Sequence, residues 1–546
     1  MRGFDLTSEG WIPLLTVDGG LVEVGVAQAL VRAETFTEIV TELPTQVPAL
    51  LRQVLLPIVA DALGLPESRA EWERRFTAGR FTGEEKDRLL AYLEEHCERF
   101  DLLGDQPFGQ VADLEASSGD TKGAGLMVAV EFTGNNVPLY GVRTEADPPA
   151  LTLAEAVRWL LHLHCWDTAA IKTGARGDAK AKAGKTTGNP TGPLGQLGVV
   201  VPVGRTLYET LLLNLPIKHN GFRGEPQWRR PQSGPQWEIR PERGLLDLWT
   251  WQSRRVHLFP EETPDGLRVR RVVVAAGDRL QRLPEWEPHT AWKYDKPPGK
   301  AKLSDRKPLR HQPGKAIWRG MDALLALELA ASDSRTVETS ELLKQAAELR
   351  EEGCLPEDYP LRVEAFGITY GNQSAVIENV YHDSIPLPLA ALQADAALFA
   401  ELQLMASQAE QLARAVNYLS ADLRRASGLD PIPWDKGQRP GERVLHLLDP
   451  VVRLVLRNLR SHDVDRLDKI VLAWESRAYQ VARKVADMEF ATLPESVFAG
   501  RSEGDKGRAF GIGNAEAQFR RRLGAILPTY RDNRPPDDGT GDEEYT

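Results

Sequence analysis

From about residue 387 onward the sequence changes to long segments rich in Ala, Leu, Gln and Arg, and this change constrains the fold most strongly. The apolar residues of these segments recur with helical periodicity, and short connectors separate them. The segments cover residues 387–426, 441–460, 464–490 and 512–526. Consecutive amphipathic helices of this length favour a bundle, in which each helix buries one apolar stripe. We therefore predict a C-terminal four-helix bundle over residues 387–528.

The preceding residues, 1–386, alternate between strand-like and helix-like patterns, which predicts a separate mixed α/β domain and an α+β fold class overall. A chain of 546 residues is also too long for a single hydrophobic core. The helix expected over 152–171 has a well-defined start, because Thr152 and Glu155 have the spacing of a capping box. Further expected elements are strands at 11–14, 199–201 and 268–276 and helices at 48–63, 84–100 and 208–215.

Charge is distributed unevenly along the chain. The net charge of −11 at first argues against a nucleic-acid partner, but binding depends on where the charge lies. Residues 221–321 contain 21 Lys and Arg against 12 Asp and Glu, whereas residues 529–546 contain six acids against two arginines. The basic middle is therefore compatible with a local nucleic-acid surface. The acidic tail, 529–546, is expected to be disordered.

Several classes of protein are disfavoured. No run of about 18 apolar residues is apparent, which argues against a membrane span, and the N-terminus lacks the pattern of a signal peptide. Three scattered cysteines support neither a disulfide framework nor a four-cysteine zinc site. His162 and His164 would point to different faces of a helix, so one metal ion could not easily bind both. We expect a cytoplasmic protein without a bound metal or membrane.

Taken in order, several segments resemble the CasA family, the large subunit of the type I-E CRISPR Cascade surveillance complex. These segments are Trp11-Ile12-Pro13, Gln106 to Gln110, a helix that runs into the Gly-rich loop at 174–198, Tyr370 to Gln373, and the helical C-terminal quarter. The resemblance implies an α/β domain followed by a four-helix bundle, as the periodicity also predicts. The implied partners are the other Cascade protein subunits, the guide CRISPR RNA and double-stranded target DNA.

The resemblance also implies a function and no catalytic activity or cofactor. Members of the family recognise a short protospacer-adjacent motif from the minor-groove side, help to unwind the duplex, and recruit a separate helicase–nuclease. The stretch that matches the family's glutamine wedge is Tyr370 to Ser374, so Asn372 and Gln373 are candidate DNA-binding residues. On the residues alone, Gly371-Asn372 also reads as a turn between two strands, and both interpretations can hold together.

The Gly-rich loop matches the family's minor-groove glycine loop in position. Its candidate contact residues are Gly184, Lys185, Thr186, Thr187, Gly188 and Asn189, although the family has more consecutive glycines there. A surface loop without DNA contacts is the simpler interpretation. Residues 179–186 also approach a phosphate-binding P-loop, which would make the chain an NTP-binding enzyme. That motif requires a preceding strand and a following helix, whereas a helix precedes it here and Pro190 follows soon after.

Basic residues complete the candidate DNA surface. The family's basic finger falls on Arg279 or Arg282, and Lys122 lies in a Gly/Ser-rich loop, 117–125, that approaches the guide RNA and the duplex in the family. In the predicted bundle, the spacing of Arg453, Arg457 and Arg460 places them on one helix face. Such a stripe can bind phosphates without sequence preference, or it can simply be a solvated face.

Overall fold

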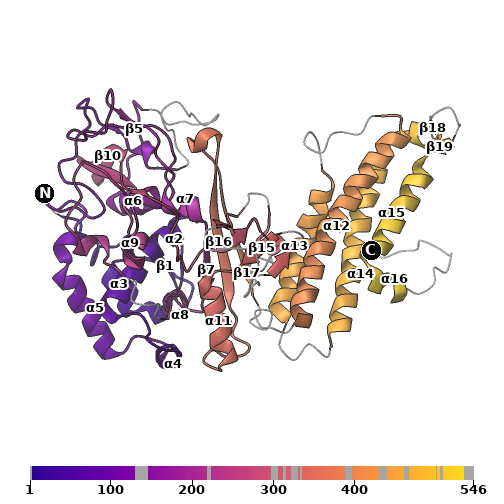
Figure 1. The fold of residues 1–546 in the computed structure, drawn as a ribbon, viewed down its shortest axis with the longest axis horizontal. Helices are drawn as coiled ribbons and strands as arrows, with labels where there is room; N and C mark the ends of the chain where they lie inside the picture. Colours follow the sequence, from indigo (N-terminus) through magenta and orange to yellow (C-terminus); the bar gives the residue numbers. More distant parts are fainter. Residues whose placement is uncertain are drawn as a thin grey trace. The chain divides into compact units, whose positions relative to one another are not determined.

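A computed structural model of the chain describes residues 3–129, 145–217, 223–296, 305–311, 315–320, 330–332, 335–387, 396–429, 439–459, 466–499, 501–503 and 508–533. The chain divides into two compact units. The first comprises Met1–Ile317 and Asp322–Leu392, and the second comprises Trp318–Met321 and Gln393–Thr546. The first unit mixes strands and helices and the second is dominated by helices, so the α+β fold class predicted from the sequence is confirmed (Figure 1).

A long antiparallel pair belongs to the five-stranded sheet of the first unit. Strands β9 (Arg254–Thr263) and β10 (Gly266–Ala276) pair along their whole length, which confirms the strand expected at 268–276. In the same sheet, β10 also pairs with β4 (Lys122–Gly123) and β5 (Lys172–Thr173), and β5 pairs with β6 (Lys185–Thr186). This sheet therefore brings the predicted loops around Lys122 and Lys185 onto one framework.

The remaining sheets of this unit are small. One contains β1 (Ile12–Thr16), β2 (Leu21–Val24) and β3 (Phe36–Ile39), and another contains β7 (Val199–Val203), β16 (Arg362–Tyr370) and β17 (Ile377–Pro386). Two further sheets contain β8 (Ile239–Arg240) with β11 (Arg279–Leu280), and β12 (Trp292–Tyr294), β13 (Arg306–Pro308), β14 (Ala330–Ser332) and β15 (Arg335–Glu338). The short β8–β11 pair matters most for the site, because it fixes Arg279 beside Ile239.

A helical stretch over Gln46–Leu63 fills the core of the first unit. It comprises α2 (Gln46–Leu50), a π-helical turn (Leu51–Leu55) and α3 (Leu56–Leu63). By length and composition this stretch could cross a membrane, contrary to the expectation that no such run is present, but 89% of it is buried within the protein. Such burial is typical of a core helix in a globular domain.

The buried Arg52 in this stretch is neutralised by a carboxylate. Its guanidinium donates hydrogen bonds of 2.9 and 2.7 Å to the two carboxylate oxygens of Glu287. Burial raises the pKa of this carboxyl, but Arg52 and His289 outweigh it and lower the pKa to about 2. The pair satisfies both charges where water is excluded.

Helix α6 (Leu153–Trp166) starts as predicted. The Thr152 hydroxyl accepts a hydrogen bond from the Glu155 N–H, and the Glu155 carboxylate accepts one from the Thr152 N–H. His162 contacts the Thr45 hydroxyl at 2.9 Å, whereas His164 contacts the Gly109 carbonyl oxygen at 2.8 Å. The two rings therefore point in different directions, as expected from their spacing.

Other helices of the first unit are shorter. They are α1 (Val26–Val31), α4 (Arg69–Ala78), α5 (Gly83–Glu95), α7 (Pro193–Leu197), α8 (Leu207–Leu213), α9 (Leu245–Trp249) and α11 (Glu341–Glu351). Helices α5 and α8 confirm two of the helical segments expected from periodicity, with α5 followed by a 3-10 turn over Cys97–Phe100.

The second unit contains the predicted bundle. Its long helices are α12 (Ala396–Ala426), α13 (Gly441–Asn458), α14 (Leu467–Ala491) and α15 (Ile512–Ile526), which lie side by side (Figure 1). A buried polar group joins two of them: Trp474 Nε1 donates to Gln408 Oε1 at 2.7 Å, and Gln408 Nε2 donates to Glu475 Oε1 at 2.7 Å. The described helices therefore match the four segments predicted from periodicity.

The predicted disorder of the tail is wrong at its start. Residues Pro528–Asn533 form helix α16, which contacts α14 and α15. The Tyr530 N–H donates to Glu475 Oε2 at 2.7 Å, and the Tyr530 ring lies 4.6 Å from that of Tyr479. These contacts with α14 order residues that are polar by composition. Residues 534–546 lie outside the described part of the chain.

Candidate nucleic-acid interface

The tip of the β16–β17 hairpin is attached to the end of α6, although about 200 residues separate them in sequence. The Tyr370 hydroxyl donates a 2.6 Å hydrogen bond to the Trp166 carbonyl oxygen. The Ala169 N–H donates a 2.7 Å hydrogen bond to the Ser374 carbonyl oxygen. A side chain at Gly195 would meet the Tyr370 hydroxyl at 2.3 Å, so only glycine permits this approach. The hairpin tip is therefore held by bonds on both sides of its turn.

The two candidate wedge residues lie in that turn and are exposed. Asn372–Ser374 form a single 3-10 turn between the strands, which confirms the turn interpretation. Gln373 and Ser374 have φ angles of 53°, in the left-handed region that non-glycine residues rarely adopt. An exposed amide held at a rigid tip can be presented to a partner with little loss of conformational entropy.

The Gly-rich loop folds back on itself. Lys185 and Thr186 form β6, which pairs with Thr173 and Lys172 respectively. Lys185 and Thr187 are exposed, whereas Thr186 is buried. Gly184 and Gly188 have φ angles of 69° and 67°, so the turns on either side of Thr186 require glycine at both positions.

Asn189 has a structural role in this loop. It is buried, and its Nδ2 atom donates to the carbonyl oxygens of Thr186 and Ala170 at 2.9 and 3.1 Å. The loop is therefore tied to the same segment, 166–172, that holds the hairpin tip. Among the candidate residues of this loop, the side chains of Lys185 and Thr187 are presented to solvent.

The P-loop interpretation of residues 179–186 is wrong. Phosphate binding by that motif uses the N-terminus of a helix that begins at the Gly-Lys-Thr sequence. Here Lys185 and Thr186 form a strand instead, and the next helix, α7, begins at Pro193. Because β6 pairs with β5, these residues lie in a sheet, and no helix begins at the position where the motif needs one.

Of the two basic-finger candidates, Arg279 contacts the Gly-rich loop. Its Nη2 atom donates to the Thr187 carbonyl oxygen at 3.0 Å and to Asn189 Oδ1 at 3.1 Å. Its guanidinium carbon lies 3.7 Å from the centre of the Trp237 ring. Arg282 is 65% exposed and pairs at 2.8 Å with Glu285, three residues away. The structure thus brings Arg279 and the loop together and leaves Arg282 at the surface.

Lys122 lies on the same sheet as the Gly-rich loop. It is exposed in β4, where it pairs with Val272 of β10. The Ser117 N–H donates a 2.8 Å hydrogen bond to the Gly174 carbonyl oxygen, which joins the two predicted loops directly. Part of the polar loop that contains Lys122 is therefore ordered by pairing with β10.

The arginine stripe lies on the separate helical unit. Arg453 forms an ion pair with Asp449 at 2.7 Å, one turn earlier in α13. Arg457 is exposed on the next turn. Arg460 lies outside the described residues. Two members of the stripe therefore share a helix face, and Asp449 partly neutralises the charge of Arg453.

A buried ion-pair group at the base of the Gly-rich loop could not be found from the sequence. Arg254, 1% exposed, pairs with Asp167, and Asp167 also pairs with Lys172 at 2.6 Å. Burial raises the pKa of Asp167, but Lys172 and Arg254 outweigh this effect and lower it. Arg254 Nη2 also donates to the carbonyl oxygens of Thr168 and Pro190 at 2.7 and 2.8 Å. One arginine thus joins the segment before the loop, at Thr168, to Pro190 within the loop.

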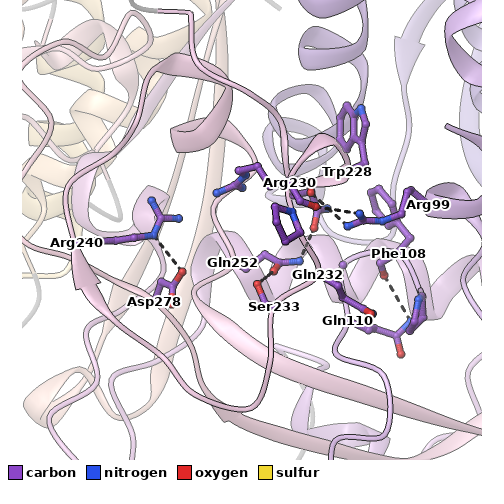
Figure 2. Close-up of a pocket in the computed structure, with 14 residues that line it drawn as sticks. Arg99, Phe108, Gln110, Trp228, Arg230, Gln232, Ser233, Arg240, Gln252 and Asp278 are labelled. Atoms are coloured by element: carbon purple, nitrogen blue, oxygen red, sulfur yellow. Dashed lines mark hydrogen bonds and ion pairs between the residues drawn. The ribbon is translucent and has the colours of Figure 1, made fainter. Parts of the chain in front are cut away.

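A small polar cavity lies between residues 227–233 and residues 107–110 (Figure 2). Its volume is about 40 Å³, which is room for about three waters. Arg99 and Arg230 line it, but Arg99 donates to the Arg230 and Gln227 carbonyl oxygens and Arg230 pairs with Asp247. The cavity is too small for a nucleotide or an organic cofactor.

No three His, Cys, Asp or Glu side chains converge as metal ligands within the described residues. Burial lowers the pKa of His162 to about 3 and that of His164 to about 4, so both imidazoles are neutral at neutral pH. Their ring contacts are with Thr45 and Gly109, as described above. These histidines are therefore core residues, each with one ring nitrogen in a polar contact with the protein.

The chain is similar to known proteins over nearly its whole length. The family model of CRISPR-associated protein Cse1 matches residues 5–485. CRISPR-associated protein CasA/Cse1 of Thermus thermophilus is 29% identical over 439 residues, which are 78% of this chain and 79% of that protein. The crystal structure of Thermobifida fusca Cse1 has 31% sequence identity and a TM-score of 0.81, covering 96% of this chain and 98% of that one. A chain of a CRISPR RNA-guided surveillance complex has the same fold at 22% identity, with a TM-score of 0.66 and coverage of 90% and 100%.

Proposed function

Because this chain belongs to the CRISPR-associated protein Cse1 family, we propose that it reads a short protospacer-adjacent motif in target DNA and helps to open the duplex beside it. The chain is a CasA/Cse1-type subunit of a CRISPR RNA-guided surveillance complex. One observation supports the proposal most: the hairpin tip and the Gly-rich loop both attach to segment 166–172. Two exposed elements joined through one short segment can contact adjacent parts of the same duplex.

The hairpin tip supplies the group that separates the strands. The side chain of Gln373 presents an amide that can replace base-edge hydrogen bonds, while its flat face stacks on an exposed base. Opening a base step costs a few kcal/mol, so other contacts must contribute. Asn372 is exposed beside it and adds a second amide at the same tip. The rigid turn keeps both amides extended toward the duplex.

The Gly-rich loop supplies the groove contacts. Small residues at Gly184 and Gly188 let the backbone N–H and C=O groups approach base edges. Lys185 and Thr187 are the exposed side chains between them and contact the backbone phosphates. The minor groove distinguishes mainly A·T from G·C pairs, so several related motifs will be tolerated.

Other basic residues add binding without sequence preference. Lys122 lies on the sheet that carries the Gly-rich loop, and Arg282 is exposed near Arg279. On the bundle, Arg453 and Arg457 hold a phosphate backbone together with Arg460. These residues strengthen the complex at low salt, and guide-RNA pairing supplies the specificity for the full target.

The subunit has no catalytic step of its own in this proposal. It acts in the cytoplasm with the other Cascade proteins and the guide RNA, binds double-stranded DNA and then presents a surface to a separate helicase–nuclease. Cleavage belongs to that partner. The chain therefore needs only groups that bind DNA, and the hairpin tip and the Gly-rich loop supply them.

The wedge is tested with Gln373→Ala in the reconstituted complex. Binding to duplex target is expected to weaken about tenfold, whereas binding to a target with a pre-melted bubble beside the motif stays within about twofold. The matched control is Asn379→Ala, which removes an exposed amide of the same hairpin away from its tip. Equal loss on both substrates would contradict the wedge.

The motif-reading role is tested by comparing complexes with and without the chain on duplexes that differ only in a randomised flank. A flank preference that appears only when the chain is present supports the proposal. Equal binding to every flank, with and without the chain, would make it a purely architectural subunit.

A further inference from the structure

The Trp237 side chain holds the first arm of the Gly-rich loop. Its Nε1 atom donates a 3.1 Å hydrogen bond to Asp178 Oδ2. The ammonium of Lys180 lies 4.3 Å from the centre of the Trp237 ring and donates to the Trp237 carbonyl oxygen. Trp237 is 7% exposed, so it is part of the folded framework and not of the loop. The loop therefore leaves the core at a fixed point.

Arg279 holds the second arm. Its Nη2 atom bonds the Thr187 carbonyl oxygen and Asn189 Oδ1, as described above, and its guanidinium lies against Trp237. A side chain at Gly188 would meet Arg279 Nη1 at 3.6 Å, so the loop backbone passes close to the guanidinium. One Trp–Arg pair thus contacts the loop both before and after its turn.

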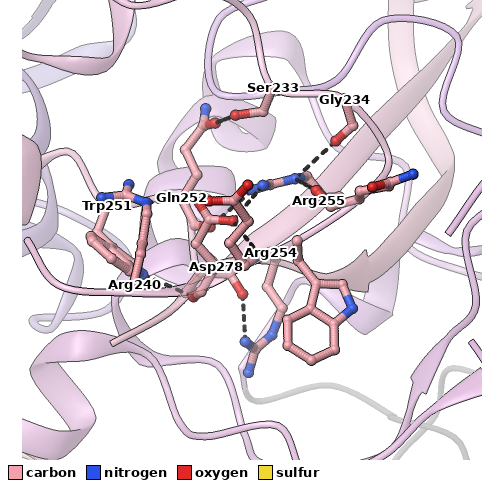
Figure 3. Close-up of polar contacts among 12 residues, drawn as sticks. Ser233, Gly234, Arg240, Trp251, Gln252, Arg254, Arg255 and Asp278 are labelled. Carbon is pink, nitrogen blue, oxygen red and sulfur yellow. Dashed lines mark hydrogen bonds and ion pairs between the residues drawn. The ribbon is translucent and has the colours of Figure 1, made fainter. Parts of the chain in front are cut away.

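The backbone holds this pair in register. Strands β8 and β11 pair Ile239 with Arg279, and the Arg279 N–H donates to the Glu238 carbonyl oxygen at 2.8 Å. The preceding residue, Asp278, accepts a 2.6 Å hydrogen bond from Arg255 and a 3.2 Å one from Arg240 (Figure 3). Strand pairing and the hydrogen bonds of Asp278 therefore fix the backbone next to both Trp237 and Arg279.

We propose that Trp237 and Arg279 form a clamp that sets the position of residues 184–189 against the DNA groove, so that Arg279 is a positioning residue and not a groove contact. The inference rests on the proposed function and assigns a role to Trp237 that the sequence did not suggest. Its physical basis is that one guanidinium edge is already bonded to the loop and one face is covered by indole. Insertion into a groove would break these contacts.

The clamp requires a planar guanidinium. An arginine can stack on an indole and donate to two acceptors at once, whereas a lysine ammonium is a compact point charge. Arg279→Lys therefore keeps the charge that a phosphate or groove contact needs and removes the geometry that the clamp needs. This difference separates the two roles.

The test measures two properties in four single variants and one double variant. The single variants are Arg279→Lys, Arg279→Gln, Trp237→Leu and Trp237→Phe, and the double variant combines Arg279→Lys with Trp237→Leu. The first is amide hydrogen exchange of residues 174–189 in the full chain. The second is DNA binding by the reconstituted complex, measured as flank preference and as salt dependence, on duplexes selected by the wild-type complex from a randomised flank. Arg205→Lys is the matched control, because Arg205 is 60% exposed, pairs with Glu209 four residues away and has no part in the proposed interface.

Arg279→Lys and Trp237→Leu are expected to speed exchange in 184–189 and to reduce flank preference about tenfold, the scale of one lost base contact. The double variant should lose no more than either single one. The slope of log K against log salt concentration should not change, and Trp237→Phe, which keeps a ring, should retain most of the preference. Arg205→Lys should match wild type in both measurements.

The clamp is overturned if exchange is unchanged in both variants. It is also overturned if Arg279→Lys keeps the flank preference while Arg279→Gln loses it and lowers the salt slope by about 1, since this pattern identifies a direct phosphate contact. A third outcome is faster exchange in the variants together with a wild-type complex that shows no flank preference. This outcome would retain the clamp as a loop-positioning device and would refute the proposed DNA role.

Discussion

The hydroxyl of Tyr370 donates a 2.6 Å hydrogen bond to the carbonyl oxygen of Trp166, the last residue of α6. This bond joins a hairpin end to a helix end that 204 residues of sequence separate. Burial raises the pKa of Tyr370 well above its ordinary value, so the hydroxyl remains a donor across the accessible pH range. The hairpin tip is thereby fixed relative to segment 166–172.

Tyr370→Phe is expected to loosen the tip without unfolding the protein. Removing the hydroxyl leaves the Trp166 carbonyl without this donor, at a cost of about 1–3 kcal/mol. Duplex binding should fall several-fold while binding to a pre-melted target is retained, which a titration with both targets measures. Tyr381→Phe in the same hairpin is the control. Unchanged duplex binding in Tyr370→Phe would show that the bond does not position the tip.

Arg254→Met is expected to destabilise the first unit strongly. The substitution leaves Asp167 buried with Lys172 alone and removes the bonds to the loop carbonyls of Thr168 and Pro190, and breaking a buried pair typically costs about 3–5 kcal/mol. The control is Arg270→Met, whose side chain is 36% exposed and whose ion pairs are worth about 0–1 kcal/mol. Urea unfolding of both variants checks the difference, and equal losses would contradict it.

Stability is expected to fall as the pH drops from about 6.5 to 4. The pKa values of His162 and His164 are about 3 and about 4 in the folded chain, below the ordinary value of 6.5. Within that window the unfolded chain binds more protons than the folded one, so acid favours unfolding. Urea unfolding at a series of pH values measures the slope. His164→Gln should flatten it, and an unchanged slope would mean that other groups dominate.

The bundle stripe makes a prediction about salt. In the reconstituted complex, Arg457→Gln should lower the slope of log K against log salt by about 1, since one phosphate contact is lost. Arg453→Gln should also lower it, although Asp449 already neutralises part of that charge. Binding measured from low to moderate salt checks both. Identical slopes in wild type and both variants would identify the stripe as a solvated face.

Lys185→Ala is expected to leave nucleotide binding by the purified chain unchanged, because Lys185 lies in a strand and not at a helix N-terminus. The same substitution should weaken duplex binding by the complex modestly, since it removes one exposed cation of the loop. Equilibrium dialysis with ATP and duplex titration measure the two effects. ATP binding that Lys185→Ala abolishes would restore the enzymatic interpretation.

Local patterns determined the elements of this protein. Periodicity predicted the four bundle helices, the spacing of Thr152 and Glu155 predicted the start of α6, and the turn at Gly371-Asn372 was readable between two apolar runs. Each of these signals depends on residues a few positions apart, where backbone geometry dictates which side chains meet. The same signals were insufficient at Pro528–Asn533, where contacts with α14 order a polar segment.

Only the tertiary structure decided which candidate residues act together. The bond between Tyr370 and Trp166 and the contact of Arg279 with Asn189 each join residues 90 or more positions apart. No periodicity records such pairings, because they arise when separate elements pack around a common core. Arg254 and Trp237 carried no signal in the sequence for the same reason. An arginine or tryptophan has the same local pattern whether it faces solvent or joins the two arms of a loop.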